Sequence, residues 1–160
     1  MLQHVLSAIT GKPVKERLNE RCLAYAREHG LPKDLIQVLD ECAYAGPIRI
    51  GTLSLSRLAE FDRENSEEEN AQCISHGFLI VGSGLNGDPI ALELTSGRMA
   101  FISHDLLWEG AYDEFEECVV RTPLRFHEFW LEASQASNFP RDSYDAEERW
   151  PSSPGGGETG

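Results

Sequence analysis

Basic residues are scarce in this sequence: 14 Lys and Arg stand against 27 Asp and Glu in 160 residues, and the formal net charge is −13. A protein that neutralises phosphates needs a basic surface, so this balance argues against nucleic-acid binding. Long apolar runs are also missing, since no stretch approaches the roughly 18 residues of a membrane span. The first twelve residues lack the basic start and long apolar middle of a signal peptide. We therefore expect a soluble, cytoplasmic protein with no nucleic-acid or membrane partner.

Cysteine is equally sparse, with four widely spaced residues at positions 22, 42, 73 and 118. A chain of this length buries roughly 70% of its unfolded surface and needs no disulfide to fold. We expect reduced, mostly buried thiols. Cys73 and His76 have the spacing of half a zinc site, but no second half follows. The sequence therefore predicts no metal and no other cofactor, although Cys73, His76 and His104 leave a metal-dependent enzyme open as an alternative.

Catalytic motifs are lacking too. Residues 82–87, Gly-Ser-Gly-Leu-Asn-Gly, match the dinucleotide fingerprint, but a strand pattern follows where a phosphate-binding helix is required. We interpret Asn86-Gly87 as a turn. Ser103-His104-Asp105 contains the residue types of a hydrolase triad, but on a strand neighbouring side chains point to opposite faces, and no Gly-x-Ser-x-Gly elbow is present. We predict no catalytic residues and no enzymatic activity.

Helical and strand periods are clear in the N-terminal half. Apolar spacing predicts a helix over 13–29 and a second from Leu31-Pro32 to Gly46-Pro47, which together form a helical hairpin. Residues 48–53 alternate as a half-buried strand, and Ser54 or Ser56 is placed to cap a short helix that runs through Phe61. The polar residues 65–70 indicate an exposed loop.

The centre of the chain predicts three antiparallel strands in succession, at about 78–81, 89–94 and 98–103. Residues 106–117 are ambiguous, and 118–120 have the composition of a short strand. Thr122 and Pro123 suit the start of a closing helix that extends through Ala133. The predicted fold is α+β: a mainly antiparallel sheet with a central three-strand meander, an N-terminal helical hairpin and a C-terminal helix packed on the sheet. We assign residues 1–137 to one domain and 138–160 to a polar tail rich in Pro, Gly and Ser.

The excess negative charge lies in the middle third. Residues 60–117 contain 14 acids and only two basic residues, Arg63 and Arg98. Most of these acids form two runs, the first of Glu60, Asp62, Glu64, Glu67, Glu68 and Glu69, and the second of Asp105, Glu109, Asp113, Glu114, Glu116 and Glu117. Three aromatic residues are interleaved with the second acidic run. Aromatics among acids are typical of surfaces that bind basic proteins, although the acids can equally be a solvated face and the rings core residues. The candidate partner-binding residues are Glu67, Glu68, Glu69, Trp108, Glu109, Tyr112, Asp113, Glu114, Phe115, Glu116 and Glu117.

Four segments, in this order, resemble the SUKH superfamily, which includes fungal regulators of cell-wall synthesis and many bacterial immunity proteins. They are the helix start Leu31-Pro32, the run 77–82 (Gly-Phe-Leu-Ile-Val-Gly), the hairpin 87–97 (Gly-Asp-Pro-Ile-Ala-Leu-Glu-Leu-Thr-Ser-Gly) and the helix segment 126–130 (Phe-His-Glu-Phe-Trp). The resemblance covers about residues 10–136. It implies an α+β domain without catalysis or a required cofactor, whose function is protein binding.

The resemblance and the charge distribution lead to the same hypothesis. Bacterial members typically sit beside polymorphic toxins, often nucleases, and block them by direct contact, and a nuclease tends to be basic where it binds phosphates. We therefore expect an immunity-type protein that binds and neutralises a cationic toxin domain. Two alternatives stay open besides a metal enzyme: a regulatory scaffold of the cell-wall-regulator type that binds endogenous proteins, and an acidic DNA mimic that occupies a DNA-binding protein.

Overall fold

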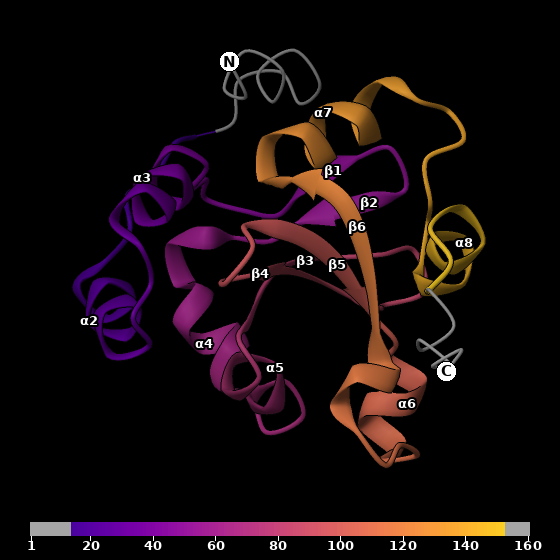
Figure 1. The fold of residues 1–160 in the computed structure, drawn as a ribbon. Coiled ribbons are helices and arrows are strands. Elements are labelled where there is room, and N and C mark those ends of the chain that lie inside the picture. The colour runs from indigo at the N-terminus through magenta and orange to yellow at the C-terminus, as the bar shows by residue number, and fades with distance from the viewer. Residues whose placement is uncertain (1–13, 153–160) are drawn as a thin grey trace.

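Six strands form one antiparallel sheet in which each strand pairs with its neighbours in the chain, in the order β1-β2-β3-β4-β5-β6 (Figure 1). The structure, a computed structural model, describes residues 14–152. The strands are β1 (Ile48–Ile50), β2 (Leu53–Leu55), β3 (Phe78–Ser83), β4 (Pro89–Glu93), β5 (Arg98–Ile102) and β6 (Val119–Arg125). The antiparallel sheet, with helices before, between and after its strands in the chain, confirms the predicted α+β class. Strands β3 to β5 form the predicted meander.

Both faces of the sheet are buried. Because successive side chains on each strand point to opposite faces, alternate residues of a strand belong to different cores. One face contributes Leu79, Val81, Ile90, Leu92, Met99, Phe101 and Val120 to the larger core. The other contributes Phe78, Ile80, Ala91, Ala100, Ile102 and Val119 to a smaller one. Residues of the helices α2 (Glu20–Glu28), α3 (Lys33–Glu41), α4 (Phe61–Ser66) and α7 (Phe126–Gln135) help to complete the larger core. Cys73 of α5 (Ala71–Ser75), Leu107 of α6 (His104–Glu109) and Phe115 help to complete the smaller one. Continuous apolar runs in the meander are therefore the signature of a sheet covered on both faces.

The predicted N-terminal helical hairpin is confirmed, with shorter helices: α2 (Glu20–Glu28) and α3 (Lys33–Glu41). Helix α2 starts late because the Asn19 side chain accepts a hydrogen bond from the Cys22 amide at 2.9 Å. Residues before it pair with the chain after α3, through a bridge between Lys15 and Tyr44. Position 13, the predicted helix start, lies outside the described residues.

The segment predicted as one strand over 48–53 is a hairpin of two strands, because Gly51 has a φ of +62° and turns the chain between β1 and β2. The predicted short helix is present as a 3₁₀ turn η1 (Leu58–Glu60) followed by α4 (Phe61–Ser66). Helix α5 (Ala71–Ser75) was not predicted. Asn65, expected in an exposed loop, is buried, and its side chain bonds the Ile80 amide of β3 at 2.7 Å.

The ambiguous segment 106–117 falls in helix α6 (His104–Glu109) and the 3₁₀ turn η2 (Phe115–Cys118). The predicted start of the closing helix is wrong. Thr122 lies within β6 and donates a hydrogen bond from its hydroxyl to the Met99 carbonyl at 2.9 Å, and α7 (Phe126–Gln135) begins only afterwards. The Glu128 side chain caps α7 by accepting from the Arg125 amide at 3.1 Å.

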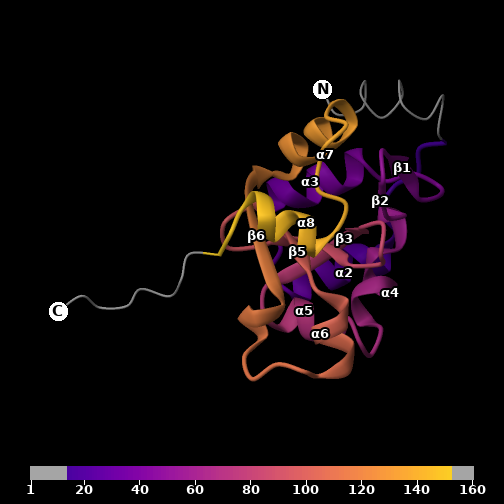
Figure 2. The same cartoon turned by 90° about the vertical axis from the view of Figure 1, so that its right-hand side faces the viewer.

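The chain beyond residue 137 also differs from the prediction. Helix α8 (Ser143–Arg149), absent from the predicted tail, packs against β5 and β6, as Figure 2 shows. Phe139 and Ala146 are buried, and the Phe139 ring meets the Phe129 ring of α7 at 5.0 Å and 90°. Burial of these two apolar side chains contributes to holding this polar segment on the fold, and the Asp142 side chain caps α8 by accepting from the Asp145 amide at 2.9 Å. The rest of the predicted tail, 153–160, lies outside the described residues.

The four cysteines are free and buried, as predicted. Burial raises the pKa of Cys42 and of Cys73 to about 12, so these thiols stay protonated at neutral pH. Within residues 14–152, no helix is both long enough and apolar enough to cross a membrane.

Candidate functional site

The two acidic runs meet at one end of the molecule, where α5 and α6 lie side by side at the bottom of Figure 1. The first run begins in η1 and α4 and ends with Glu67 to Glu69, which connect α4 to α5. The second run extends from α6 through η2. Two contacts join α5 and the residue after it to the segment that carries the second run. The Tyr112 hydroxyl donates to the Gln72 side chain of α5, and the Phe115 ring stacks on His76 at 4.2 Å with the planes 9° apart. Tertiary packing thus gathers charges that are about 40 residues apart in the chain.

The three aromatic candidates occupy different environments. Phe115 is 6% exposed and packs in the smaller core against Phe78, so its assignment to a partner-binding surface is corrected: burial of its ring stabilises the fold. Tyr112 is half-buried and bonded to Gln72. Trp108 is 48% exposed, and the centre of its ring lies 4.8 Å from that of the His104 ring. Trp108 alone has the exposure expected of a binding anchor.

Three of the acidic candidates have structural partners. The side chains of Glu114 and Glu117 form a capping box around η2. Glu116 forms an ion pair with Arg121 at 2.6 Å, and this hydrogen bond lowers the pKa of the Glu116 carboxyl. These acids therefore stabilise local structure. Among the described residues, no hydrogen bond or ion pair engages the side chains of the remaining candidates, which are all exposed: Glu67, Glu68, Glu69, Glu109 and Asp113.

Basic residues from outside the acidic segment neutralise part of it, which the distribution of charge along the sequence does not reveal. Arg21 pairs with Asp62 at 3.9 Å and Arg57 with Glu60 at 3.7 Å. Arg121 lies between two carboxylates, Glu116 and Glu93, the latter at 2.7 Å. Among the candidate residues, the unpaired charge therefore lies in the α4–α5 connection, on the last residue of α6 and just after that helix.

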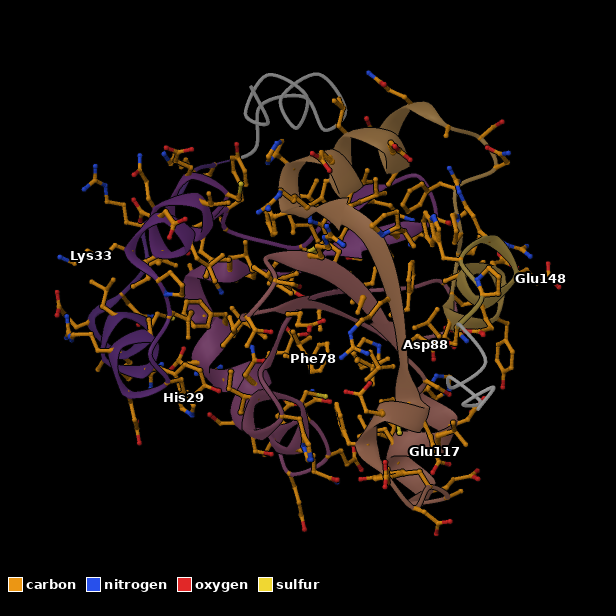
Figure 3. The ribbon with its side chains drawn as sticks, in the orientation of Figure 1. His29, Lys33, Phe78, Asp88, Glu117 and Glu148 are labelled. Atoms are coloured by element: carbon orange, nitrogen blue, oxygen red, sulfur yellow. The ribbon has the colours of Figure 1, made fainter. Side chains whose placement is uncertain are left out.

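A second cluster surrounds Asp88, a fully buried carboxylate in the turn before β4. One oxygen accepts from the His104 amide at 3.0 Å and lies 2.5 Å from His104 Nδ1, and the other accepts from the Ser143 amide at 2.7 Å. Burial alone raises the pKa of Asp88, but the hydrogen bonds from His104 and Ser143 outweigh it, so the net shift is downward. Figure 3 shows Asp88 between α8 and the segment that carries Glu117. Asp88 thus fastens the starts of α6 and α8 to one turn.

His104 lies between two carboxylates, because its Nε2 atom is 3.0 Å from the Asp105 side chain. Asp105 in turn accepts a hydrogen bond from the Tyr144 hydroxyl of α8 at 2.9 Å. Contrary to the prediction that neighbouring side chains here point apart, His104 and Asp105 meet, because both belong to the first turn of α6. Within the described chain, both ring nitrogens of His104 face carboxylates and none of its bonds goes to the Ser103 hydroxyl, so a Ser-His-Asp relay does not form.

The other motifs are accounted for by the fold. Residues 82–87 end β3 and turn into β4, with Gly87 at a φ of +93°, as the turn interpretation predicts. Cys73 is buried in the smaller core, whereas the His76 ring stacks on Phe115 and His104 binds Asp88. No group of three or more His, Cys, Asp or Glu side chains in residues 14–152 is arranged to hold a metal ion.

Comparisons of the chain with models of protein families, with curated proteins and with solved structures each found no match. A proposal about function therefore has to be based on the side chains that the structure exposes.

Sequence reasoning missed Asp88, His104 and Tyr144 as members of one cluster. Asp88 follows Asn86-Gly87, so its turn was predictable, but its partners lie 16 and 55 residues further along the chain. Tyr144, which is 62% exposed, falls in the segment predicted as a tail. Its signal was the aromatic ring itself, two residues after a helix-capping Asp142.

Proposed function

We propose that this chain is a protein-binding domain for a basic protein, and that it acts as an immunity-type protein that binds and neutralises a cationic toxin domain. The observation that carries the proposal is the exposed Trp108 ring at the end of the molecule where both acidic runs meet. Glu109, the next residue in the chain, is exposed and its side chain has no partner within the described chain. We infer a cytoplasmic location, with which four free, buried thiols agree.

The chemistry of this surface suits a basic partner. A half-exposed Trp buries a large apolar area when a second protein covers it, and Trp is among the most frequent hot-spot residues. Unpaired carboxylates at the same end of the molecule attract a basic protein and raise its rate of association. The resemblance to the SUKH superfamily, whose bacterial members block toxins by contact, agrees with this chemistry.

The charge-reversal variants are best placed at acidic residues whose side chains have no structural partner. Substituting Glu114, Glu116 or Glu117 perturbs the η2 cap or the Arg121 ion pair as well as any interface. Glu67, Glu68 and Glu69 are exposed and unpaired, so E67K/E68K/E69K changes the charge of the surface and leaves the contacts of the fold in place. The matched control reverses three exposed acids of α2 and α3, E20K/E28K/D34K, which lie on the other side of Figure 1 from α6.

The test is affinity capture from the native cell at low salt, repeated with a high-salt wash, followed by binding of the retained protein to each variant. We expect one basic toxin fragment, released in part by salt. Its affinity falls on the order of 30-fold in Trp108→Ala, and falls with a flattened salt dependence in E67K/E68K/E69K but not in the control. Retention of housekeeping proteins alone favours a regulatory scaffold. A partner that binds all the variants equally contradicts the proposed surface.

A further inference from the structure

A hollow of about 640 Å³ lies beside the acidic end, between α6, the η2–β6 segment and α8. Its lining includes Leu106, Glu117, Val119, Tyr144 and Glu147. They come from three segments that Asp88 and the sheet hold together, so the hollow is a product of the tertiary fold. It lies over β6, the edge strand of the sheet.

The lining combines apolar walls with carboxylates. Leu106, Val119 and the Tyr144 ring provide apolar surface, whereas Glu117 and Glu147 provide negative charge. The third lining carboxylate, Glu116, is neutralised by Arg121, which bonds both of its oxygens. No Lys, Arg or His is among the lining residues within 14–152. A long aliphatic stem with a positive end matches both parts of such a surface.

The carboxylates retain capacity to accept hydrogen bonds. Glu117 accepts from the Asp113 and Glu114 amides through one oxygen, Oε1, and no bond within the described chain engages its Oε2. Glu147 accepts from Ser152 through both oxygens, at 2.9 and 3.0 Å, and each carboxylate oxygen has a second lone pair. At the edge of the hollow, Asp105 holds the Tyr144 hydroxyl and so fixes the exposed ring.

The neighbouring surface shows how an arginine is held on this fold. The Arg121 guanidinium lies 5.5 Å from the centre of the Phe78 ring and bonds carboxylates on two sides, Glu93 at 2.7 Å and Glu116 at 2.6 Å. An aromatic face with flanking carboxylates is thus already an arginine site here. The hollow repeats this combination with Tyr144, Glu117 and Glu147, but no arginine of the described chain enters it.

We propose that this hollow receives an arginine side chain of a basic protein partner, with its aliphatic stem on Leu106 and Val119 and its guanidinium between the Tyr144 ring and the carboxylates of Glu117 and Glu147. The proposal rests on the proposed function and extends it, because it assigns a second contact surface and one recognised side chain. Arginine suits the site better than lysine, since its planar group stacks on rings and bonds several carboxylates at once. Addition of a partner strand to β6 is a weaker match, because Pro123 has no N–H group to donate.

The first experiment uses a defined probe, the peptide acetyl-(Gly-Arg)₄-amide, and a twin in which citrulline replaces arginine to remove the charge and keep the shape. Backbone amide NMR shifts of the full chain are followed during titration. We expect the arginine peptide to shift the amides of Leu106, Val119, Val120 and Tyr144, the lysine analogue to bind several-fold more weakly, and the citrulline twin to leave these signals unmoved. Equal shifts with the twin, or shifts confined to residues 67–69 and 109–114, overturn the proposal.

The second experiment uses matched variants. Tyr144→Ala lowers affinity for the arginine peptide roughly fivefold, whereas Tyr144→Phe, which keeps the ring, retains most of it. Glu147→Gln lowers affinity, and Glu148→Gln, the next residue on α8 and outside the lining, does not. Circular dichroism melting shows whether each variant is folded. Equal affinity in Tyr144→Ala and wild type overturns the proposal.

The two proposals fail separately. A captured basic protein that binds Tyr144→Ala as tightly as wild type, but loses affinity for Trp108→Ala, leaves the proposed function standing and overturns the arginine site. An arginine peptide that shifts the amides lining the hollow, with no basic protein retained from the cell, supports the arginine site and contradicts the proposed function.

Discussion

Asp88 shows how one residue determines the geometry around a candidate site. Its buried carboxylate accepts hydrogen bonds from the first amides of α6 and α8 and from His104, and so joins two short helices that have few residues to stabilise them alone. Helices of this length are unstable in isolation, so tertiary contacts of this kind decide whether they form. The positions of Trp108 on α6 and Tyr144 on α8 both depend on it.

We expect Asp88→Asn to lower the free energy of unfolding by about 2–4 kcal/mol, because an amide in place of the carboxylate leaves buried N–H groups poorly paired. Urea unfolding at neutral pH measures the change. Asp113→Asn is the control, since that side chain is exposed and has no partner within the described residues, and it stays within about 0.5 kcal/mol of wild type. A small effect at Asp88 means that water or a shifted α8 satisfies the same amides.

The pH dependence of stability follows from the same carboxyl. The pKa of Asp88 in the folded state lies below its ordinary value of 3.8, so its contribution is present above about pH 4 and is lost as the pH falls through the folded-state pKa. Glu116 and Asp145 shift in the same direction. The informative quantity is therefore a difference: between pH 6 and pH 2, Asp88→Asn loses less stability than wild type. Parallel pH curves for the two proteins contradict this assignment.

At the scale of helices and strands, the local sequence predicts the structure best where the apolar residues follow a single pattern. The meander β3 to β5 has compact apolar runs separated by Gly-rich turns, and it forms as predicted. Thr122 and Pro123 mislead because a helix cap and an edge-strand position favour the same residues, and only the hydrogen bond from Thr122 to Met99 on β5 decides between them. Helix α8 is missed because its hydrophobic contribution is small and its stability comes from distant contacts.

A substitution at Phe139 tests how much these long-range contacts stabilise the fold. The side chain is 6% exposed and meets Phe129 of α7 and Trp150 after α8, with ring centres 5.0 and 6.1 Å away. We expect Phe139→Ala to lower the free energy of unfolding by about 3 kcal/mol, since truncation leaves a cavity among these rings. The control Leu85→Ala removes an exposed side chain and changes stability by about 0.5 kcal/mol or less. A neutral Phe139→Ala variant shows that the segment after residue 137 contributes little, as the sequence predicted.

At the scale of the whole molecule, the sequence predicts the sign of the charge on the candidate surface but not which residues form that surface. The acidic runs and Trp108 are visible in the sequence, and the structure places them at one end. Whether a given acid is free depends on partners far along the chain, as Glu60 with Arg57 and Glu93 with Arg121 show. Phe115 and Trp108 have similar sequence surroundings, yet only packing against Phe78 and His76 buries the first.

The unpaired acids also predict how salt acts on the free protein. Repulsion among Glu67, Glu68, Glu69, Glu109 and Asp113 destabilises the folded state, and 0.5 M salt shortens the screening length to roughly 4 Å, about a third of its value at 0.05 M. We expect the free energy of unfolding to rise with NaCl by on the order of 1 kcal/mol, and E67Q/E68Q/E69Q to be more stable than wild type at low salt with a smaller gain from salt. Urea unfolding at the two salt concentrations measures both. If salt instead lowers stability, the ion pairs of Arg57, Arg121 and Arg141 outweigh the repulsion, and the acidic end carries less free charge than a basic partner requires.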